Sequence, residues 1–136
     1  MSSIIFGARE VPVVTLSAAT TVEANQSGTT FILDAAAGAT ITLPSVANGL
    51  VFRFVVGAAF ATTNWIVDSA EGDNITGNLL VNGAAVPAAA EDQINFVATA
   101  ETVGDYIELI ADYGNSQWIV TGIGNAAGAI TATDPS

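Results

Sequence analysis

The sequence contains no histidine, cysteine or lysine among its 136 residues, and its basic residues are Arg9 and Arg53. Most enzymes use histidine, cysteine or lysine to transfer protons, attack carbonyl groups or hold metals near neutral pH. Asp and Glu together number 13, which gives a formal net charge of −11. These absences predict a structural or binding protein without a cofactor, and they argue against an enzyme.

The shortage of basic residues also limits the partners of this protein. Nucleic-acid binding depends on Lys and Arg contacts to phosphate, and anionic membranes attract basic segments. We therefore expect neither nucleic acid nor membrane as a partner. The chain has no apolar run near the roughly 20 residues of a transmembrane helix, and no basic segment that begins a secretory signal. Without cysteine it forms no disulfide. Assembly in the cytoplasm fits these features best.

Charged residues make up 11% of the chain, and hydrophobic residues make up 51%. Soluble domains usually contain about 25% charged residues. The surface must therefore consist largely of Ser, Thr, Asn, Gly and Ala, with scattered acids. A weakly charged surface favours association, so the sequence predicts a homo-oligomer.

Short runs of Val, Ile, Thr, Phe and Trp alternate with Gly, Asn, Asp and Pro, which is typical of strands and turns. In Ala39–Leu43 apolar residues alternate with Thr, so one side of the strand should be buried. We expect strands at Val11–Leu16, Thr29–Asp34, Ala39–Leu43, Leu50–Gly57, Asn64–Asp68, Leu79–Asn82, Gln93–Ala98, Asp105–Asp112 and Ser116–Gly122. Their regular spacing predicts an all-β, antiparallel sandwich or barrel of jelly-roll type. The alanines of Ala88–Asp92 predict at most one helical turn.

The two ends differ from the middle of the chain. We expect an N-terminal arm at residues 1–14, a sandwich domain at 15–122 and a C-terminal arm at 123–136. Both arms contain apolar residues and few charges, so we expect them to pack on a neighbouring subunit or a larger assembly. Frayed or self-packed tails are the alternative. The predicted contact residues are Ile4, Ile5, Phe6, Ile123 and Ile130.

Arg53 lies between apolar residues in a predicted strand, with Val51 and Val55 on its own face. A half-buried guanidinium needs a carboxylate partner, and Asp68, Glu108 and Asp112 are candidates. We expect a structural ion pair within or between subunits. Removal of Arg53 should then cost several kcal/mol, as for a buried pair.

Carboxylates offer two further alternatives. Glu108 with Asp112, or Glu91 with Asp92, could form the acid pair of a glycoside hydrolase. The segment Asp68–Asn74 is rich in oxygen ligands suited to Ca²⁺, although its spacing does not match an EF-hand. Solvated acids in a polar turn explain both patterns more simply.

The block from Thr30 to Gly122 resembles a family of small bacteriophage virion proteins, which includes capsid decoration (cement) proteins and related modules of tail and head fibres. The matching segments are Phe31–Asp34, Gly38–Pro44, Gly49–Phe54, Gly72–Ile75 with Gly77, Gly104–Leu109 and Gln117–Gly122. The resemblance implies a β-sandwich or barrel that forms a trimer on a virion, and it carries no catalytic residues.

The resemblance leaves the place on the virion open, and the sequence favours the capsid. Fibre proteins are usually long, whereas this chain is short. A strongly acidic trimer would also be repelled by packaged DNA, which favours the outer surface of the head. We therefore expect a homotrimeric decoration protein that binds the major capsid protein. A receptor- or glycan-binding module of a tail or head fibre is the alternative.

Overall fold

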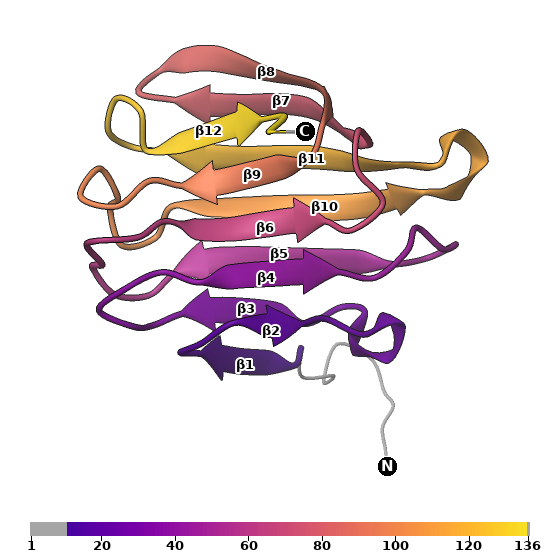
Figure 1. Ribbon diagram of the computed structural model, residues 1–136, viewed down its shortest axis with the longest axis horizontal. Coiled ribbons are helices and arrows are strands. Elements are labelled where there is room, and N and C mark those ends of the chain that lie inside the picture. The colour runs from indigo at the N-terminus through magenta and orange to yellow at the C-terminus, as the bar shows by residue number, and fades with distance from the viewer. Residues whose placement is uncertain (1–10, 136) are drawn as a thin grey trace.

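The computed structural model describes residues 11–135, which form two β-sheets packed as a sandwich (Figure 1). The larger sheet contains seven strands in the order β1 (Val13–Leu16), β3 (Thr30–Leu33), β5 (Val51–Val56), β10 (Tyr106–Asp112), β11 (Gln117–Gly124), β7 (Ile75–Val81) and β8 (Ala84–Glu91). The smaller sheet contains β12 (Ile130–Thr133), β9 (Gln93–Phe96), β6 (Trp65–Ser69), β4 (Thr40–Leu43) and β2 (Thr20–Thr21). The predicted all-β sandwich is therefore confirmed.

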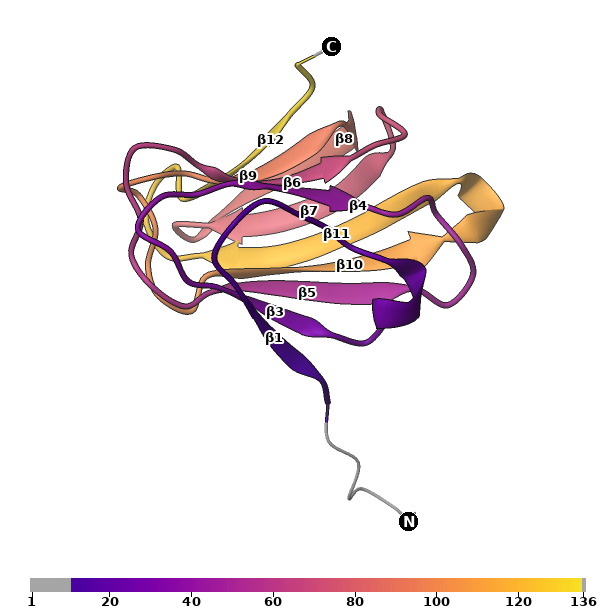
Figure 2. The same ribbon diagram turned by 60° about the horizontal axis from the view of Figure 1, so that its bottom comes forward.

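The first six strands wind between the two sheets. β1, β3 and β5 lie parallel in the larger sheet, while β2, β4 and β6 lie parallel in the smaller one. Each successive strand thus crosses to the opposite sheet, and every second strand adds to the same ladder, as Figure 2 shows. The remaining strands include the antiparallel β7–β8 and β10–β11 hairpins, and β7 also pairs with β11 in parallel.

Aromatic and branched side chains fill the space between the sheets. Phe31 and Phe54 occupy paired positions on adjacent parallel strands, and their rings stack with centroids 5.2 Å apart. Phe52 packs against Trp118 at 5.9 Å. All four side chains are fully buried. The alternation seen in the sequence supplies this core, because every second residue of β3, β5, β10 and β11 points inward.

Three sequence predictions need correction. The sheets are mixed, because five of the ten strand pairings are parallel. The sheets also remain separate and do not close into a barrel. The residues 88–92, predicted as a helical turn, mostly belong to β8, which pairs with β7. Ala88 there is buried in the core, so packing overrides the helical preference of alanine.

The C-terminal segment also differs from the prediction of an arm. Its strand β12 pairs with β9, and Ile130 is 1% exposed. This strand therefore completes the core of its own domain. The N-terminal arm is predicted to extend to residue 14, but β1 already includes Val13 and Val14, and residues 1–10 lie outside the described residues. Across residues 11–135, no helix has the length and apolar character needed to cross a bilayer.

Candidate binding surface

The outer face of the seven-stranded sheet is largely apolar, although no element of the described chain covers it. Residues that point away from the core align across neighbouring strands in register. One such row joins Ile32, Val55, Tyr106, Ile123 and Leu80 from β3 to β7. Ile123 and Leu80 are each 46% exposed. We call this set the Tyr106 row.

A second apolar row crosses the same face nearer the β10–β11 turn. It consists of Val51, Ile110 and Ile119, and Ile110 is 44% exposed. Between the two apolar rows lies a polar row that contains Thr30, Arg53, Glu108, Thr121 and Asn78. The face therefore combines two apolar rows with a polar row that carries one ion pair.

Arg53 and Glu108 form that ion pair. Nη2 of Arg53 lies 3.6 Å from Oε2 of Glu108, and the Arg53 guanidinium carbon lies 5.2 Å from the centroid of the Tyr106 ring. Among the three predicted candidates, Glu108 is therefore the partner of Arg53. The side chains are 47% and 32% exposed, so this pair is largely hydrated. The predicted cost of several kcal/mol for losing Arg53 is too large, because exposed pairs contribute at most about 1 kcal/mol.

The other two candidate partners of Arg53 bind elsewhere. Asp68 lies on β6 of the smaller sheet and accepts a hydrogen bond from Nε2 of Gln93 at 3.2 Å. Asp112 ends β10 and accepts hydrogen bonds from the side chains of Asn115 and Gln117. These amide donors lower the pKa of Asp112, with Asn115 contributing most.

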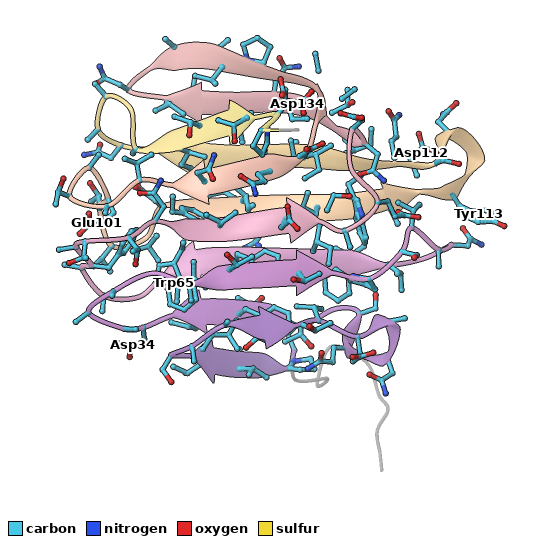
Figure 3. The ribbon with its side chains drawn as sticks, viewed as in Figure 1. Asp34, Trp65, Glu101, Asp112, Tyr113 and Asp134 are labelled. Carbon is cyan, nitrogen blue, oxygen red and sulfur yellow. The ribbon has the colours of Figure 1, made fainter. Side chains whose placement is uncertain are left out.

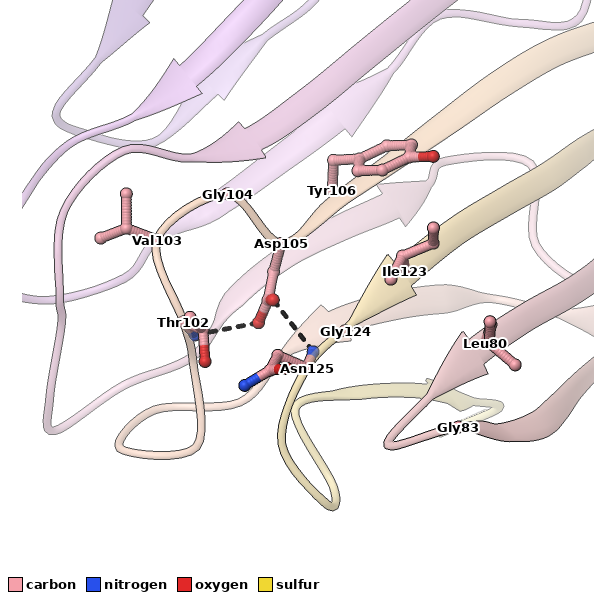
Figure 4. Close-up of a pocket in the computed structure, with 10 residues that line it drawn as sticks. All are labelled: Leu80, Gly83, Thr102, Val103, Gly104, Asp105, Tyr106, Ile123, Gly124 and Asn125. Carbon is pink, nitrogen blue, oxygen red and sulfur yellow. Dashed lines mark hydrogen bonds between the residues drawn. The ribbon is translucent and has the colours of Figure 1, made fainter.

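Two shallow hollows lie at this outer face. The larger, about 440 Å³, is lined by the apolar side chains of Leu80, Val103, Tyr106 and Ile123 and by polar loop residues (Figure 4). The carboxylate of Asp105 is already occupied there, because it accepts hydrogen bonds from the backbone N–H groups of Thr102 and Asn125. The part of this hollow left for a ligand is therefore mainly apolar.

The smaller hollow, about 380 Å³, lies beside β1. Val11, Val13 and Val51 line it together with Thr30 and the Arg53–Glu108 pair. Val11 and Val13 are more than 60% exposed. The apolar surface thus continues to the edge of the sheet where the described chain begins.

The outer face of the smaller sheet has a different character. Its outward residues include Thr40, Thr42, Asn95, Thr131 and Thr133. Nδ2 of Asn95 donates to the hydroxyl groups of Thr131 and Thr133 at 3.2 and 2.9 Å. Ile66 is the apolar exception in the two rows to which these residues belong, which otherwise carry Thr, Asn, Gln and Asp side chains, so the more apolar outer face of the sandwich is that of the larger sheet.

Of the two predicted carboxylate pairs, Glu108, Asp112 and Asp92 are held by other groups of the described chain. Glu108 and Asp112 are four residues apart on one strand, which separates their Cα atoms by about 13 Å. Glu108 also pairs with Arg53, and Asp112 is held by two amides. In the pair Glu91 and Asp92, Oδ1 of Asp92 accepts the backbone N–H of Asp73 at 2.6 Å.

A cluster of acids that the sequence does not predict lies near the C-terminus, where Asp134 is labelled in Figure 3. Carboxylate oxygens of Asp73, Asp92 and Asp134 lie within 4.8 Å of one another. The charge on Asp134, followed by that on Asp92, raises the pKa of Asp73. Of these three residues, Asp73 alone belongs to the predicted Asp68–Asn74 segment. Three carboxylates could hold a divalent cation, which would relieve their repulsion.

The aromatic residues leave little for a carbohydrate to stack upon. Trp65 and Trp118 are both 0% exposed and belong to the core. Tyr113 is 64% exposed at the tip of the β10–β11 hairpin, which projects beyond the sandwich (Figure 3). Tyr106 lies at the opposite end of β10 from this tip, where it lines the larger hollow.

The predicted contact residues separate into three groups. Ile4, Ile5 and Phe6 lie outside the described residues. Ile123 lies on the outer face opposite Tyr106, whereas Ile130 is a core residue. Leu80 and Ile110 also lie on this face and are not among the predicted contact residues. A signal for both exists, because each is an apolar residue on the outward phase of an alternating strand.

Comparisons with known proteins found no match among family models, curated proteins or solved structures.

Proposed function

We propose that this chain is a virion structural protein that decorates the outer surface of a phage capsid as a homotrimer and binds the major capsid protein. The observation that carries this proposal is the apolar outer face of the seven-stranded sheet. A broad, shallow surface with exposed Leu80, Ile110 and Ile123 suits another protein surface better than a small substrate.

Charge supports the placement outside the capsid. The net charge of −11 disfavours contact with packaged DNA. On the outer face of the larger sheet, the charged side chains are Arg53, Glu108 and, at one end, Asp112. The acids elsewhere would keep the remaining surface hydrated, while this face approaches a partner with little electrostatic penalty.

The proposed mechanism is stabilisation by binding. A protein that binds the expanded capsid lattice, and not its precursor or its dissociated subunits, stabilises the expanded lattice by its binding free energy. Burial of each large apolar side chain on the outer face would contribute about 1.5–3 kcal/mol before the costs of association. Chemical turnover has no part in this mechanism.

The test is to add the purified protein to undecorated capsids of the phage that encodes it. We expect the protein to sediment with expanded capsids and to raise the temperature at which they break. Binding through apolar rows should persist in about 1 M salt, which screens charge pairs. A protein that remains in the supernatant, or leaves capsid stability unchanged, would contradict the proposal.

A receptor-binding role in a tail or head fibre is the second candidate. It is favoured by Tyr113, whose ring is exposed on the projecting hairpin. Binding to a glycan array that is lost in Tyr113→Ala and retained in Tyr106→Ala would support this role over capsid decoration.

A further inference from the structure

The outer face of the seven-stranded sheet has a specific relationship to the beginning of the described chain. Val11 lines the hollow formed by Val13, Val51, Arg53 and Glu108. Residues 1–10 therefore join the described chain at the edge of the apolar face. Whatever surface they contact must be reachable from this point.

The direction of the chain at this point favours a neighbouring copy. The carbonyl oxygen of Pro12 accepts a hydrogen bond from the backbone N–H of Thr30 at 2.9 Å, which extends the β1–β3 ladder beyond Val13. Proline also restricts the residue before it, Val11, to extended conformations. The chain thus enters β1 along the strand axis, and a path back across its own outer face would require an abrupt reversal.

The chemistry of residues 1–10 matches that of the outer face. Ile4, Ile5 and Phe6 form an apolar run, followed by one residue of each charge, Arg9 and Glu10. The acceptor face likewise combines apolar rows with the Arg53–Glu108 pair. Contact between these two regions would bury apolar side chains on both sides without placing two acids together.

The length of the segment is also sufficient. Phe6 lies five residues before Val11, a reach of about 17 Å when extended, and Ile123 lies two strand spacings, about 10 Å, inside the β8 edge of the sheet. The segment can therefore reach the Tyr106 row of a copy whose β8 edge lies beside β1. The hollow at the far end of that row, between Tyr106, Ile123 and Leu80, is open to an apolar side chain (Figure 4).

We propose that residues 4–6 of one copy dock on the Tyr106 row of the next copy, with Phe6 in the hollow lined by Leu80, Tyr106 and Ile123. The contact joins two different surfaces, so its repetition gives a ring of copies when the rotation between neighbours closes, as in the proposed trimer. This inference uses part of the outer face on which the proposed function also rests, but its cross-linking test needs no capsid, so the two can fail separately.

The absence of cysteine allows a direct cross-linking test. Phe6→Cys is made in a chain with a size tag, and Ile123→Cys in an untagged chain. The two proteins are mixed at low concentration and treated with a short bis-maleimide. We expect the tagged–untagged dimer to exceed by about tenfold the yield from a matched control, Phe6→Cys mixed with Thr40→Cys. Thr40 is exposed on the outer face of the smaller sheet.

Equal yields with Ile123→Cys and Thr40→Cys would overturn the proposal. A chain carrying both Phe6→Cys and Ile123→Cys gives a second test at high dilution. Efficient cross-linking within single chains would overturn the assignment to a neighbouring copy. Deletion of residues 1–10 should lower the number of copies in the assembly, as measured by light scattering. An unchanged number of copies would also overturn the proposal.

Discussion

Arg53 and Glu108 occupy directly opposite positions on β5 and β10, with their charged groups 3.6 Å apart at the middle of an otherwise weakly charged sheet face. β10 is the fourth of seven strands, so the pair lies near the centre of the outer face. The guanidinium also lies over the Tyr106 ring. This arrangement fixes a polar group between two apolar rows and leaves both partners hydrated.

The exposure of this pair sets the first prediction. Arg53→Met should lower the free energy of unfolding by no more than about 1 kcal/mol, because solvent screens the interaction. Urea unfolding of Arg53→Met, Glu108→Gln and the double variant would measure the coupling between the two side chains. A loss above about 3 kcal/mol for Arg53→Met would show that the pair behaves as a buried one.

The C-terminal strand sets the second prediction. Ile130→Ala should cost about 2–5 kcal/mol, because Ile130 is buried between β9 and the core. Ile66→Ala is the matched control, since it removes the same atoms from a partly exposed side chain on the outer face of the smaller sheet. Its cost should be clearly smaller in the same denaturant titration. Similar costs for the two variants would contradict the placement of Ile130 in the core.

The close approach of two loops sets the third prediction. A Cβ atom on Gly38 would lie 2.2 Å from the backbone carbonyl carbon of Asn64, and the Gly38 N–H donates to Thr63 at 3.1 Å. Gly38→Ala must therefore separate the β3–β4 and β5–β6 connections. We expect a loss of about 2 kcal/mol or more in thermal or urea unfolding.

Gly114→Ala is the control for this substitution. Around Gly114, the nearest atom to an added Cβ is a side-chain oxygen of Asp112, 3.8 Å away. This change should leave stability nearly unaltered. If both alanine variants behave alike, the tight contact at Gly38 does not limit the fold.

The acidic cluster sets a prediction about pH. The charges of Asp134 and Asp92 raise the pKa of Asp73 above its usual value of 3.8, so the folded protein binds this proton more tightly than the unfolded chain. Repulsion therefore lowers stability above the raised pKa and disappears as the carboxyl is protonated. Asp73→Asn should raise the melting temperature near pH 7 and change it little near pH 3.

Asp112 provides a control, because its pKa is shifted in the opposite direction from that of Asp73. Hydrogen bonds from Asn115 and Gln117 lower the pKa of Asp112, so its contribution is present above the usual pKa of 3.8 and lost as the pH falls through the lowered value. Asp112→Asn should therefore lower the melting temperature at neutral pH. A melting temperature that moves in the same direction for both variants would contradict these assignments.

The sequence predicts the core better than the topology. Alternation in segments such as Ala39–Leu43 identifies the buried side chains, because side-chain direction depends only on local strand geometry. The parallel winding depends on which distant strands meet. Val14, Phe31 and Phe54 align in space but are unequally spaced along the chain, so no repeat is visible in the sequence.

The β7–β8 hairpin was missed for a different reason. Ala84–Glu91 is rich in alanine and contains Pro87, which argues against a strand. Asn82 and Gly83 both have positive φ and form the turn that places this segment beside β7. An Asn-Gly pair after an apolar run is a strong hairpin signal, and it outweighs the composition of the strand that follows. Pro87 is tolerated because β8 is an edge strand.

The acidic cluster and the alignment of outward residues into rows across the outer face could not be derived from the sequence, for a shared reason. Asp73, Asp92 and Asp134 are distant in sequence, and strand pairing alone brings them together. Leu80 and Ile123 likewise become neighbours only through the β7–β11 ladder. Properties that arise from pairing between distant strands require the structure.

Association through the apolar outer face of the seven-stranded sheet is the feature on which both proposals depend. It can be measured by light scattering after size exclusion, on the wild-type chain and on a Leu80→Asp/Ile123→Asp variant. Both side chains are exposed in the single chain, so the variant should fold, which circular dichroism would verify. We predict a wild-type mass that is a multiple of 13.7 kDa, three-fold for the proposed trimer, and a monomeric mass for the variant. A monomeric wild type, or a variant that assembles as the wild type does, would contradict the account.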